Sequence, residues 1–503
     1  MNEKGSIYSL NGDKASAVSS RVTQSVTDKL SLNDMMNHFG VTLSDLQTVM
    51  KAAMLTGGEF ADLFFEHTFD SLLNLRDGEV NTVSANIDFG VGVRVVKGDQ
   101  TGYAYTENVA LEDMLKAART ASRIVLESRH NDAVGLSPTT RRTSYYPLIG
   151  SWEDAGVELK RPFLQKLNDR IFSLSDRVSR VLVSQTDTSS YILYANSEGL
   201  LTCDYRPMAT LTVTCIMQHD GKTENGRAAR SFRMGTEFLT DELVETLAQE
   251  VVKQTLFLFE AVSPKGGEMA VVMGAGGSGI LLHEAIGHAF EADFNRKNIS
   301  IFSDKLGKKV ADTTISVVDD GTIPFNRGSV NMDDEGVEGQ KTYLVKDGIL
   351  TSYIHDRISA RHYDVSPTGN GRRQSFRFAP IPRMRATYME NGQAAEQDLI
   401  AAVKNGVFVD TFTNGQVQIG AGDFTFFVKS GYLIENGKLT QPIKDVNIIG
   451  NGPKALADIV MVANNYTMDN GTWTCGKDGQ SCPVTCGMPS VLVSKLTVGG
   501  ANE

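Results

Sequence analysis

The chain has 503 residues, of which 41% are hydrophobic and 22% are charged, and its formal net charge is −11. This composition is typical of a globular protein with two or more domains, and the acidic balance argues against a nucleic-acid-binding surface. No run of 18 or more apolar residues occurs, so we expect no transmembrane helix and no membrane partner. Five cysteines, an odd number, favour a reducing compartment over a disulfide scaffold, and we expect a cytoplasmic protein.

The first 262 residues predict an arm followed by a mixed domain. Residues 1–40 begin with a polar stretch that lacks the apolar core of a signal peptide, and we expect a flexible N-terminal arm. Residues 41–262 predict an α+β domain of antiparallel hairpins and amphipathic helices. The hairpin signals are Asp77-Gly78, Gly98-Asp99 and Asp220-Gly221. The expected helices cover residues 44–55, 111–128, 161–175 and 240–262.

The sequence SPKGG at 263–267 interrupts the helical pattern and predicts a domain boundary. In the second domain, residues 263–503, turn dipeptides recur beside alternating apolar residues, at Asp320-Gly321, Asp347-Gly348, Asn414-Gly415 and Asn436-Gly437. A regular alternation of strands and helices is absent, so we predict a mainly antiparallel β domain and an α+β fold for the whole chain. A short helix is expected at 454–463.

One segment of the second domain combines helical periodicity with metal-ligand chemistry. His283, Glu284 and His288 form the pattern H-E-x-x-x-H, one residue longer than the H-E-x-x-H zinc motif, in which the glutamate acts as a base. Residues i and i+5 point about 140° apart on a regular helix. Both histidines therefore reach one metal ion only if the helix is distorted, and Gly287 would tolerate a π-type bulge. We predict a distorted metal-binding helix with Glu284 as the catalytic base.

Two other interpretations of this segment exist. The histidines could lie on the polar face of a surface helix. Gly274, Gly276 and Gly279 also form G-x-G-x-x-G after a strand-like run, which resembles a dinucleotide-binding fingerprint. However, the acidic residues Glu291 and Asp293 follow on the same predicted helix and not at the end of a second strand. A histidine-bearing face is also wrong for a helix packed on a parallel sheet, so the pattern favours the metal site.

A catalytic zinc site needs a third protein ligand from elsewhere in the chain. The candidates are His355, His362, the acidic residues 333–335, Cys475, Cys482 and Cys486. Cys475 lies in a glycine-rich loop that can turn a side chain inward, and thiolate is a good zinc ligand. A structural zinc site of the three cysteines is the alternative, but their spacing lacks the short C-x₂₋₄-C pairs that such sites use. We expect structural roles for His355 and His362 and a solvated turn at 333–335.

A series of short motifs runs in order through the C-terminal half. They are HEAIGHAFEADFNRK (283–297), VVDDGT (317–322), DDEGVEGQ (333–340), PTGNGRR (367–373), YLIENGKLT (432–440), DNGTWTCGKDGQ (469–480) and the late LTVGG. In this combination the chain resembles the TldD/PmbA family, also called the modulator of DNA gyrase family, and within it the TldD-like subunits. The N-terminal half matches more loosely, in the order of its hairpins and helices.

The resemblance implies a zinc metallopeptidase with His283, His288 and Cys475 as Zn²⁺ ligands and Glu284 as the catalytic residue. It also implies a dimer around an enclosed chamber that admits unfolded or flexible peptides. The expected partner is a PmbA- or TldE-like paralogue, and a homodimer is the alternative. Cys482 and Cys486 depart from the pattern, because we expect apolar or small residues there in relatives. This departure leaves a metal or redox role open for them.

The motif PTGNGRR offers donors for the negative charge that develops during peptide hydrolysis. We consider Asn370, Arg372 and Arg373 as substrate-binding residues of this kind. The alternative is that they cap turns and pair with surface carboxylates. Two other function classes also remain from the sequence: a zinc-containing regulatory binding protein without hydrolytic activity, and a nucleotide-dependent enzyme that uses the glycine loop.

Overall fold

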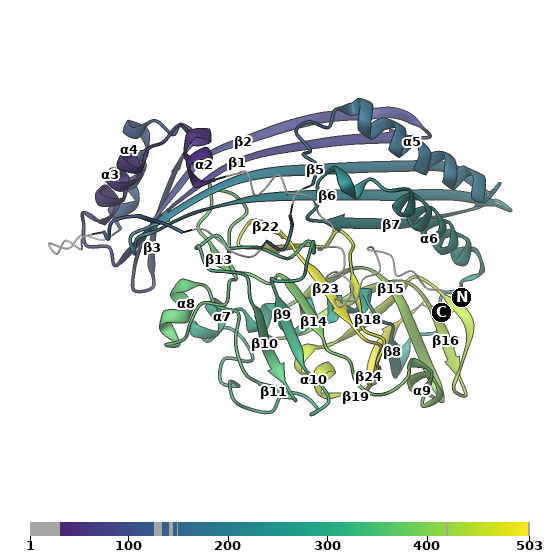
Figure 1. The fold of residues 1–503 in the computed structure, drawn as a ribbon. Coiled ribbons are helices and arrows are strands. Elements are labelled where there is room, and N and C mark those ends of the chain that lie inside the picture. The colour runs from purple at the N-terminus through teal and green to yellow at the C-terminus, as the bar shows by residue number, and fades with distance from the viewer. Residues whose placement is uncertain (1–30, 125–132, 140–143, 148, 419–420, 501–503) are drawn as a thin grey trace.

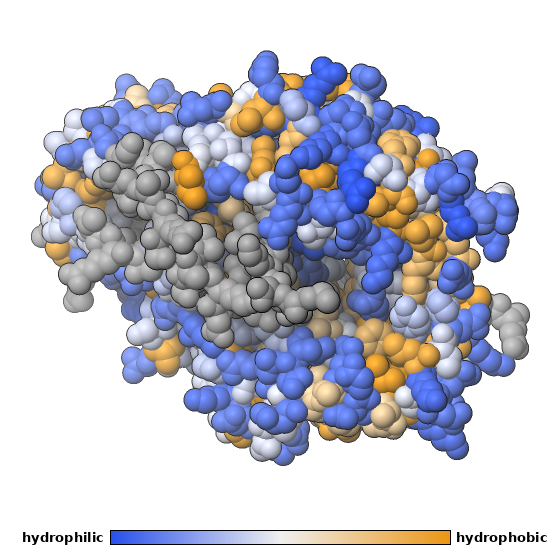
Figure 2. Space-filling view, turned by 45° about the vertical axis from the view of Figure 1, so that its right-hand side comes forward, coloured by the Kyte–Doolittle hydropathy of each residue, from blue (hydrophilic) through white to orange (hydrophobic). Residues whose placement is uncertain are grey.

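The computed structural model describes residues 31–124, 133–139, 144–147, 149–418 and 421–500. A long, curved N-terminal sheet lies over a C-terminal domain of smaller sheets (Figure 1), and this arrangement confirms the predicted α+β fold class. Hydrophilic residues predominate on the face in Figure 2, where hydrophobic residues form small separate groups. Within the described part of the chain, no helix is long and apolar enough to cross a membrane.

The N-terminal sheet has the strand order β3-β2-β1-β5-β6-β4, and β7 also pairs with β6. The strands are β1 Phe60–Arg76, β2 Glu79–Lys97, β3 Gln100–Thr106, β4 Ser137–Pro138, β5 Val178–Asn196, β6 Leu200–His219 and β7 Lys222–Phe232. All pairs are antiparallel except β4 with β6. The three predicted hairpins form. Asp77 and Gly78 both have positive φ, 53° and 83°, as a tight hairpin turn requires, and this turn sets the register of β1 on β2.

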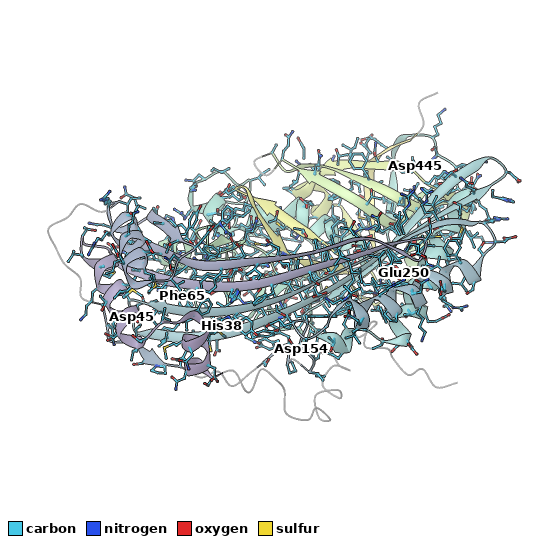
Figure 3. All side chains as sticks on the ribbon, turned by 90° about the horizontal axis from the view of Figure 1, so that it is seen from above. His38, Asp45, Phe65, Asp154, Glu250 and Asp445 are labelled. Carbon is cyan, nitrogen blue, oxygen red and sulfur yellow. The ribbon has the colours of Figure 1, made fainter. Side chains whose placement is uncertain are left out.

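Helices cover one face of this sheet in two groups. The helices are α2 Leu32–Phe39, α3 Leu43–Met54, α4 Leu111–Ser122, α5 Val157–Leu174 and α6 Asp241–Glu260. The first three lie at one end and α5 and α6 at the other, and Figure 3 shows His38 and Asp45 far from Glu250. Leu63 and Phe65 of β1 pack in the core under α3 and α4, whereas Phe64 packs on the opposite face with Phe376 of the C-terminal domain. Because successive side chains of a strand point to opposite faces, the two faces of β1 belong to two different hydrophobic cores.

Part of the predicted flexible arm is a helix. The side chain of Ser31 accepts a hydrogen bond from the Asp34 N–H, and the Asp34 carboxylate accepts one from the Ser31 N–H. This capping box begins α2, whose residues Met35 and Phe39 are buried against the sheet. The prediction of an arm that extends to residue 40 is therefore wrong for α2. Residues 1–30, and the last four of the helix predicted at 111–128, lie outside the described residues.

The C-terminal domain has two larger sheets. The first has the strand order β15-β8-β24-β18-β16-β17, and β19 also pairs with β24. The second has the strand order β11-β10-β9-β14-β23-β20. The strands are β8 Gly267–Met273, β9 Val317–Asp320, β10 Lys341–Lys346, β11 Ile349–Leu350, β12 Gly371–Arg372, β13 Ile381–Pro382, β14 Ala386–Met389, β15 Asn405–Val417, β16 Asp423–Glu435, β17 Lys438–Ile443, β18 Val446–Asn451, β19 Ile459–Val462, β20 Thr467–Asp469, β21 Thr474–Lys477, β22 Gln480–Pro483, β23 Thr485–Met488 and β24 Val491–Gly499. Pairing is mainly antiparallel, as predicted, but β15 with β8 and β14 with β23 are parallel.

Short helices connect these strands. They are α7 Ala292–Arg296, α8 Arg357–His362, α9 Glu396–Ala401 and α10 Gly452–Ala457. The helix predicted at 454–463 is therefore only partly correct, because its second half is β19, which pairs with β24. Asn451 caps α10 and Pro453 lies in its first turn, whereas the β-branched residues after Asp458 favour the strand.

The two domains meet through a buried network of charges. Arg94 of β2 donates a hydrogen bond to Glu335 at 2.6 Å, and Arg206 of β6 donates one to Asp334 at 2.6 Å. Residues 333–335 are all buried. The prediction of a solvated turn there is wrong, because arginines from the other domain, and not water, compensate these carboxylates.

The substitution Arg94→Met is expected to lower the free energy of unfolding by about 3 to 5 kcal/mol. The cause is that Asp62 and Glu335, both fully buried, lose the cation between them. As a control, Arg170→Met removes an exposed ion pair with Glu245, and this loss is expected to change the free energy of unfolding far less. Urea unfolding followed by circular dichroism measures both variants. Equal losses from the two substitutions would contradict this account of the domain interface.

Candidate metal centre

The segment with H-E-x-x-x-H follows β8 and is not a regular α-helix. Residues Leu282–Gly287 form a π-helical turn, and His288–Phe290 form a 3-10 turn. The His288 N–H donates to the carbonyl of His283, five residues earlier. This wider turn brings residues i and i+5 toward the same side. The two imidazole rings accordingly lie 5.1 Å apart between their centroids.

Glycines around this turn allow very close packing. A Cβ on Gly279 would lie 2.5 Å from the backbone nitrogen of Gly487 in β23. A Cβ on Gly452 would lie 2.1 Å from the carbonyl oxygen of Ala285, inside the π-helical turn. The G-x-G-x-x-G pattern thus leads into irregular turns packed on a strand, and not into the long helix of a nucleotide-binding unit. The nucleotide interpretation does not fit this structure.

Cys475, from the first strand of the β21–β22 hairpin, completes a cluster with the two histidines. One possible ligand atom each from His283, His288 and Cys475 lies within 4.8 Å of the others. His288 Nε2 is 3.4 Å from Cys475 Sγ, and all three residues are buried. Among the described residues this is the one group of three or more possible ligands of this kind. The other proposed third ligands do not join such a cluster.

The electrostatics of the cluster suit a cation. Burial opposes ionisation of the Cys475 thiol, but His283 and His288 beside it lower its pKa to about 4. Burial also opposes charge on His288, but Glu291 and Cys475 raise its pKa well above the usual value. Neither ring nitrogen of His283 has a hydrogen-bond partner in the described residues, although both nitrogens are buried. Buried polar atoms are rarely left unpaired, so these nitrogens are available to a ligand.

A second ring of contacts, which we did not predict from the sequence, holds His288 in place. His288 Nδ1 is 3.0 Å from the Glu291 carboxylate, and Glu291 is 3.1 Å from Lys477 Nζ. Lys477 also pairs with Asp293 at 2.7 Å. Burial alone would raise the pKa of Glu291, but Lys477 and His288 lower it to about 2. The sequence carried no signal for this pairing, because Lys477 shares a face with Cys475 only once residues 474–477 form a strand.

Glu284 is the one partly exposed residue of the four predicted for the centre. Within the described residues it makes no hydrogen bond or ion pair, so its carboxylate is available to accept a proton. It lies near Cys486: burial, Asp469 and Glu284 together raise the pKa of that thiol well above its usual value. Cys486 therefore stays a neutral thiol beside the carboxylate.

Asn370, Arg372 and Arg373 are buried and bonded to other parts of the chain. Asn370 Nδ2 donates to Asp319 at 2.6 Å and to a backbone carbonyl at 3.0 Å. Arg372 donates to the carbonyls of residues 384 and 483. Arg373 donates to the carbonyl of Asp334 and to a tyrosine hydroxyl. Because most of their donors are already occupied within the protein, the arrangement gives no support to the prediction that they bind substrate.

His355 and His362 were also considered as ligands. His355 is buried, burial lowers its pKa to about 4, and its backbone N–H donates to the Thr368 hydroxyl. Its ring lies 5.4 Å from that of Tyr363 between centroids. His362 is exposed at the end of α8. These environments agree with the structural roles that we expected.

A cleft of about 850 Å³ lies between the two domains near the cluster. It is lined by residues 225–230 of β7, 275–277 before the π-helical turn, 410–413 of β15 and 467–474, the segment that leads into Cys475. A second cavity, of about 940 Å³, is lined by residues from 309–316, 390–394 and 457–462 and contains none of the candidate residues. His283, Glu284, His288 and Cys475 line neither space, but the cleft between the domains approaches the cluster through Thr474, which directly precedes Cys475.

Relatives of known sequence and structure resemble most of the chain. A Haemophilus influenzae protein named "Metalloprotease TldD homolog" is 40% identical over 456 residues, 88% of this chain and 93% of the relative. A Saccharolobus solfataricus protein named "Zinc metalloprotease TldD homolog" is 28% identical over 90% of this chain and 99% of its own length. The crystal structure of TldE from Thermococcus kodakarensis has the same fold, with a TM-score of 0.70 and 18% identity over 91% of this chain and 100% of that one.

Family models cover most of the chain. Residues 61–125 match PmbA/TldA metallopeptidase domain 1, residues 150–257 match the central domain, and residues 266–500 match the C-terminal domain. The last match contains the π-helical turn and the Cys475 hairpin. Together with the 40% identity to a TldD homolog, these matches show that the chain belongs to the PmbA/TldD family of metallopeptidases.

Proposed function

We propose that this chain is a zinc-dependent peptidase that cleaves unfolded or flexible peptides. In this proposal His283, His288 and Cys475 hold the zinc ion and Glu284 is the general base. The observation that carries the proposal is the convergence of three buried ligand atoms within 4.8 Å, next to a partly exposed glutamate. The zinc metalloprotease name of the Saccharolobus solfataricus relative supports it.

The donor set fits zinc. Two imidazoles and a thiolate are common zinc ligands, and three protein ligands leave one position of a tetrahedral site open for water or substrate. The low pKa of Cys475 supplies the thiolate without a proton to displace. A bond from zinc would also satisfy one of the unpartnered nitrogens of His283. These three features favour zinc over hard cations such as magnesium, which prefer oxygen ligands.

Glu291 orients the second histidine. When His288 donates its Nδ1–H to the Glu291 carboxylate, the lone pair of Nε2 points toward Cys475 and the centre of the cluster. Lys477 keeps Glu291 ionised by direct contact at 3.1 Å. Because Lys477 lies on the same strand as Cys475, one hairpin supplies both a ligand and the charge that fixes another ligand.

A bound zinc ion supplies a Lewis acid, which polarises a peptide carbonyl and lowers the pKa of a water. Glu284 takes the proton of that water and later gives it to the departing amine. Its partial exposure and lack of competing partners suit this role. The neighbouring neutral thiol of Cys486 adds no charge that would compete with it.

The cleft limits the substrate. A space of about 850 Å³ accommodates a few residues of an extended chain but not a folded domain. Apolar and charged side chains both line it, including Phe412, Trp473, Arg230 and Glu250. This mixed lining favours a peptidase with broad sequence tolerance, so we propose unfolded or flexible polypeptide as the substrate class.

We further propose that the chain acts with a partner subunit in the cytoplasm. The similarity of its fold to TldE supports pairing with a TldE-like paralogue, with a second copy of this chain as the alternative. Within the described residues, Cys215, Cys475, Cys482 and Cys486 form no disulfide, which agrees with a reducing compartment. Co-expression with the paralogue, followed by size-exclusion chromatography, distinguishes the two kinds of dimer.

The substitution Glu284→Gln is expected to keep one zinc per chain but to lower the rate of peptide cleavage by about 10² to 10⁴-fold, because the amide cannot accept the proton. Mass spectrometry of peptides released from an unfolded protein measures cleavage, and a chromophoric chelator measures zinc. Glu268→Gln, at an exposed surface pair, is the matched control. Cleavage by Glu284→Gln at the wild-type rate would remove Glu284 from this role. A zinc-loaded chain that cleaves nothing with or without its paralogue would favour a regulatory binding protein.

The substitution Glu291→Gln is expected to weaken zinc binding by about 10- to 100-fold, because His288 loses the carboxylate that orients it. Asp293→Asn is the matched control. It also removes a carboxylate that pairs with Lys477, but one without a contact to His288. Competition with a chelator of known affinity measures both variants. An equal loss of affinity in the two would show that charge balance around Lys477, and not the orientation of His288, determines zinc affinity.

A further inference from the structure

We propose that Cys475 and Cys482 are a redox modification site, at which a peroxide joins the two sulfurs in a disulfide and withdraws Cys475 from the metal centre. The consequence for the metal rests on the proposed function, whereas the disulfide itself does not. Cys482 is outside the cluster of three possible ligands, so it has no assigned part in holding a metal.

The two cysteines are direct partners across a hairpin. In the antiparallel pairing of β21 with β22, Cys475 lies opposite Cys482. Opposite residues in such pairs have Cα atoms about 4.5 to 5.5 Å apart, and disulfides form at Cα separations of about 4.4 to 6.8 Å. The backbone therefore already holds the pair at a distance that a disulfide can span.

The side chains of this pair point to the same side. Along β21 and β22 the buried residues alternate with exposed ones, and Cys475 and Cys482 both lie on the buried face. The turn between the strands is tight, with φ of 49° at Asp478 and 72° at Gly479, so the register is fixed by the backbone. A one-residue slip, which would separate the two sulfurs, is opposed by this turn.

The guanidinium group of Arg383 donates hydrogen bonds to both cysteines. Its Nη1 donates to Cys482 Sγ at 3.6 Å, and its Nη2 donates to the carbonyl oxygen of Cys475. Cys486, the third cysteine of this region, differs. It lies on β23 opposite Asp469 and beside Thr387, in another sheet. The backbone pairing thus selects Cys482, and not Cys486, as the partner of Cys475.

The reaction needs only a peroxide as oxidant. The Cys475 sulfur attacks one oxygen of hydrogen peroxide. The O–O bond breaks, a sulfenic acid forms on the thiolate sulfur, and the departing hydroxide takes a proton from solvent and leaves as water. The Cys482 sulfur then attacks the Cys475 sulfur, the S–O bond breaks, and a second water forms from the Cys482 proton and the departing hydroxide. Two cysteines lose two electrons in total, and one peroxide is reduced to two waters.

The disulfide would leave only His283 and His288 as protein ligands. A disulfide sulfur is a far poorer zinc ligand than a thiolate, because the thiolate is the form that binds metal. The chain is therefore expected to lose zinc when oxidised and to recover it when a dithiol reduces the bond in the presence of zinc. Unlike oxidation to a sulfinic acid, this modification is reversible.

The experiment treats the zinc-loaded chain with hydrogen peroxide, blocks the remaining thiols and digests the denatured protein with trypsin. Trypsin cleaves after Lys477, which lies between the two cysteines, so they remain on separate peptides unless a disulfide joins them. Wild-type chain is expected to give the joined peptides and to release its zinc, and dithiothreitol with added zinc should reverse both changes. Cys486→Ala should behave in the same way, which assigns the bond to Cys482.

The variant Cys482→Ala is expected to give no joined peptides and no zinc loss that dithiothreitol can reverse. Separate peptides from oxidised wild type, or release and recovery of zinc by Cys482→Ala as in wild type, would overturn the proposal. Cys482 and Cys486 lie on one tryptic peptide, 478–495, so fragmentation of the joined peptides in the mass spectrometer locates the bond in the wild type, and this needs no variant to fold. If the wild-type chain takes up no zinc at all, the proposed function fails, while the joined peptides from the metal-free chain still decide whether the disulfide forms.

Discussion

The proposed metal centre depends on one geometric constraint: His283 and His288 must face the same point although five residues separate them. A π-helical turn meets this constraint, but such turns are rare because their backbone bonds are less favourable than those of an α-helix. The neighbours of the turn hold it in place. Gly279 packs directly on β23, and Gly452 packs directly on the carbonyl of Ala285. Tertiary packing, and not helix propensity, therefore stabilises the segment that carries both imidazoles.

The third possible ligand, Cys475, lies 187 residues after His288 in the chain. Its position is fixed by charges as well as by strand pairing. A buried carboxylate is costly unless a cation lies next to it, and Lys477 provides that cation for Glu291. The same ion pair therefore orients His288 and aligns the hairpin of Cys475 with the π-helical turn. Removal of either charge would disturb the ligand geometry and not only the stability of the fold.

Local signals in the sequence were sufficient for much of this structure. The three hairpins and the long helices follow from turn dipeptides and periodicity, because both signals act between residues close in sequence. The convergence of Cys475 with the two histidines was also expected, from ligand chemistry and a family resemblance. Contacts between distant segments were not. The parallel pairs β8–β15 and β14–β23, the burial of 333–335 and the pairing of Lys477 with Glu291 all depend on the tertiary arrangement, which leaves no periodic trace in the sequence.

The segment PTGNGRR explains why the domain interface and the metal centre belong to one network. Asp333, at the interface, accepts a hydrogen bond from the Gly371 N–H at 2.9 Å. Arg372 then donates to the carbonyl of Pro483 at 2.7 Å, at the end of the hairpin that carries Cys475. Polar groups in such a buried network cannot separate without leaving unpaired partners, so these bonds hold residues 333–335 and the hairpin of Cys475 together. The N-terminal domain is therefore joined to the hairpin of Cys475 by a continuous series of buried contacts through residues 333–335 and the PTGNGRR segment.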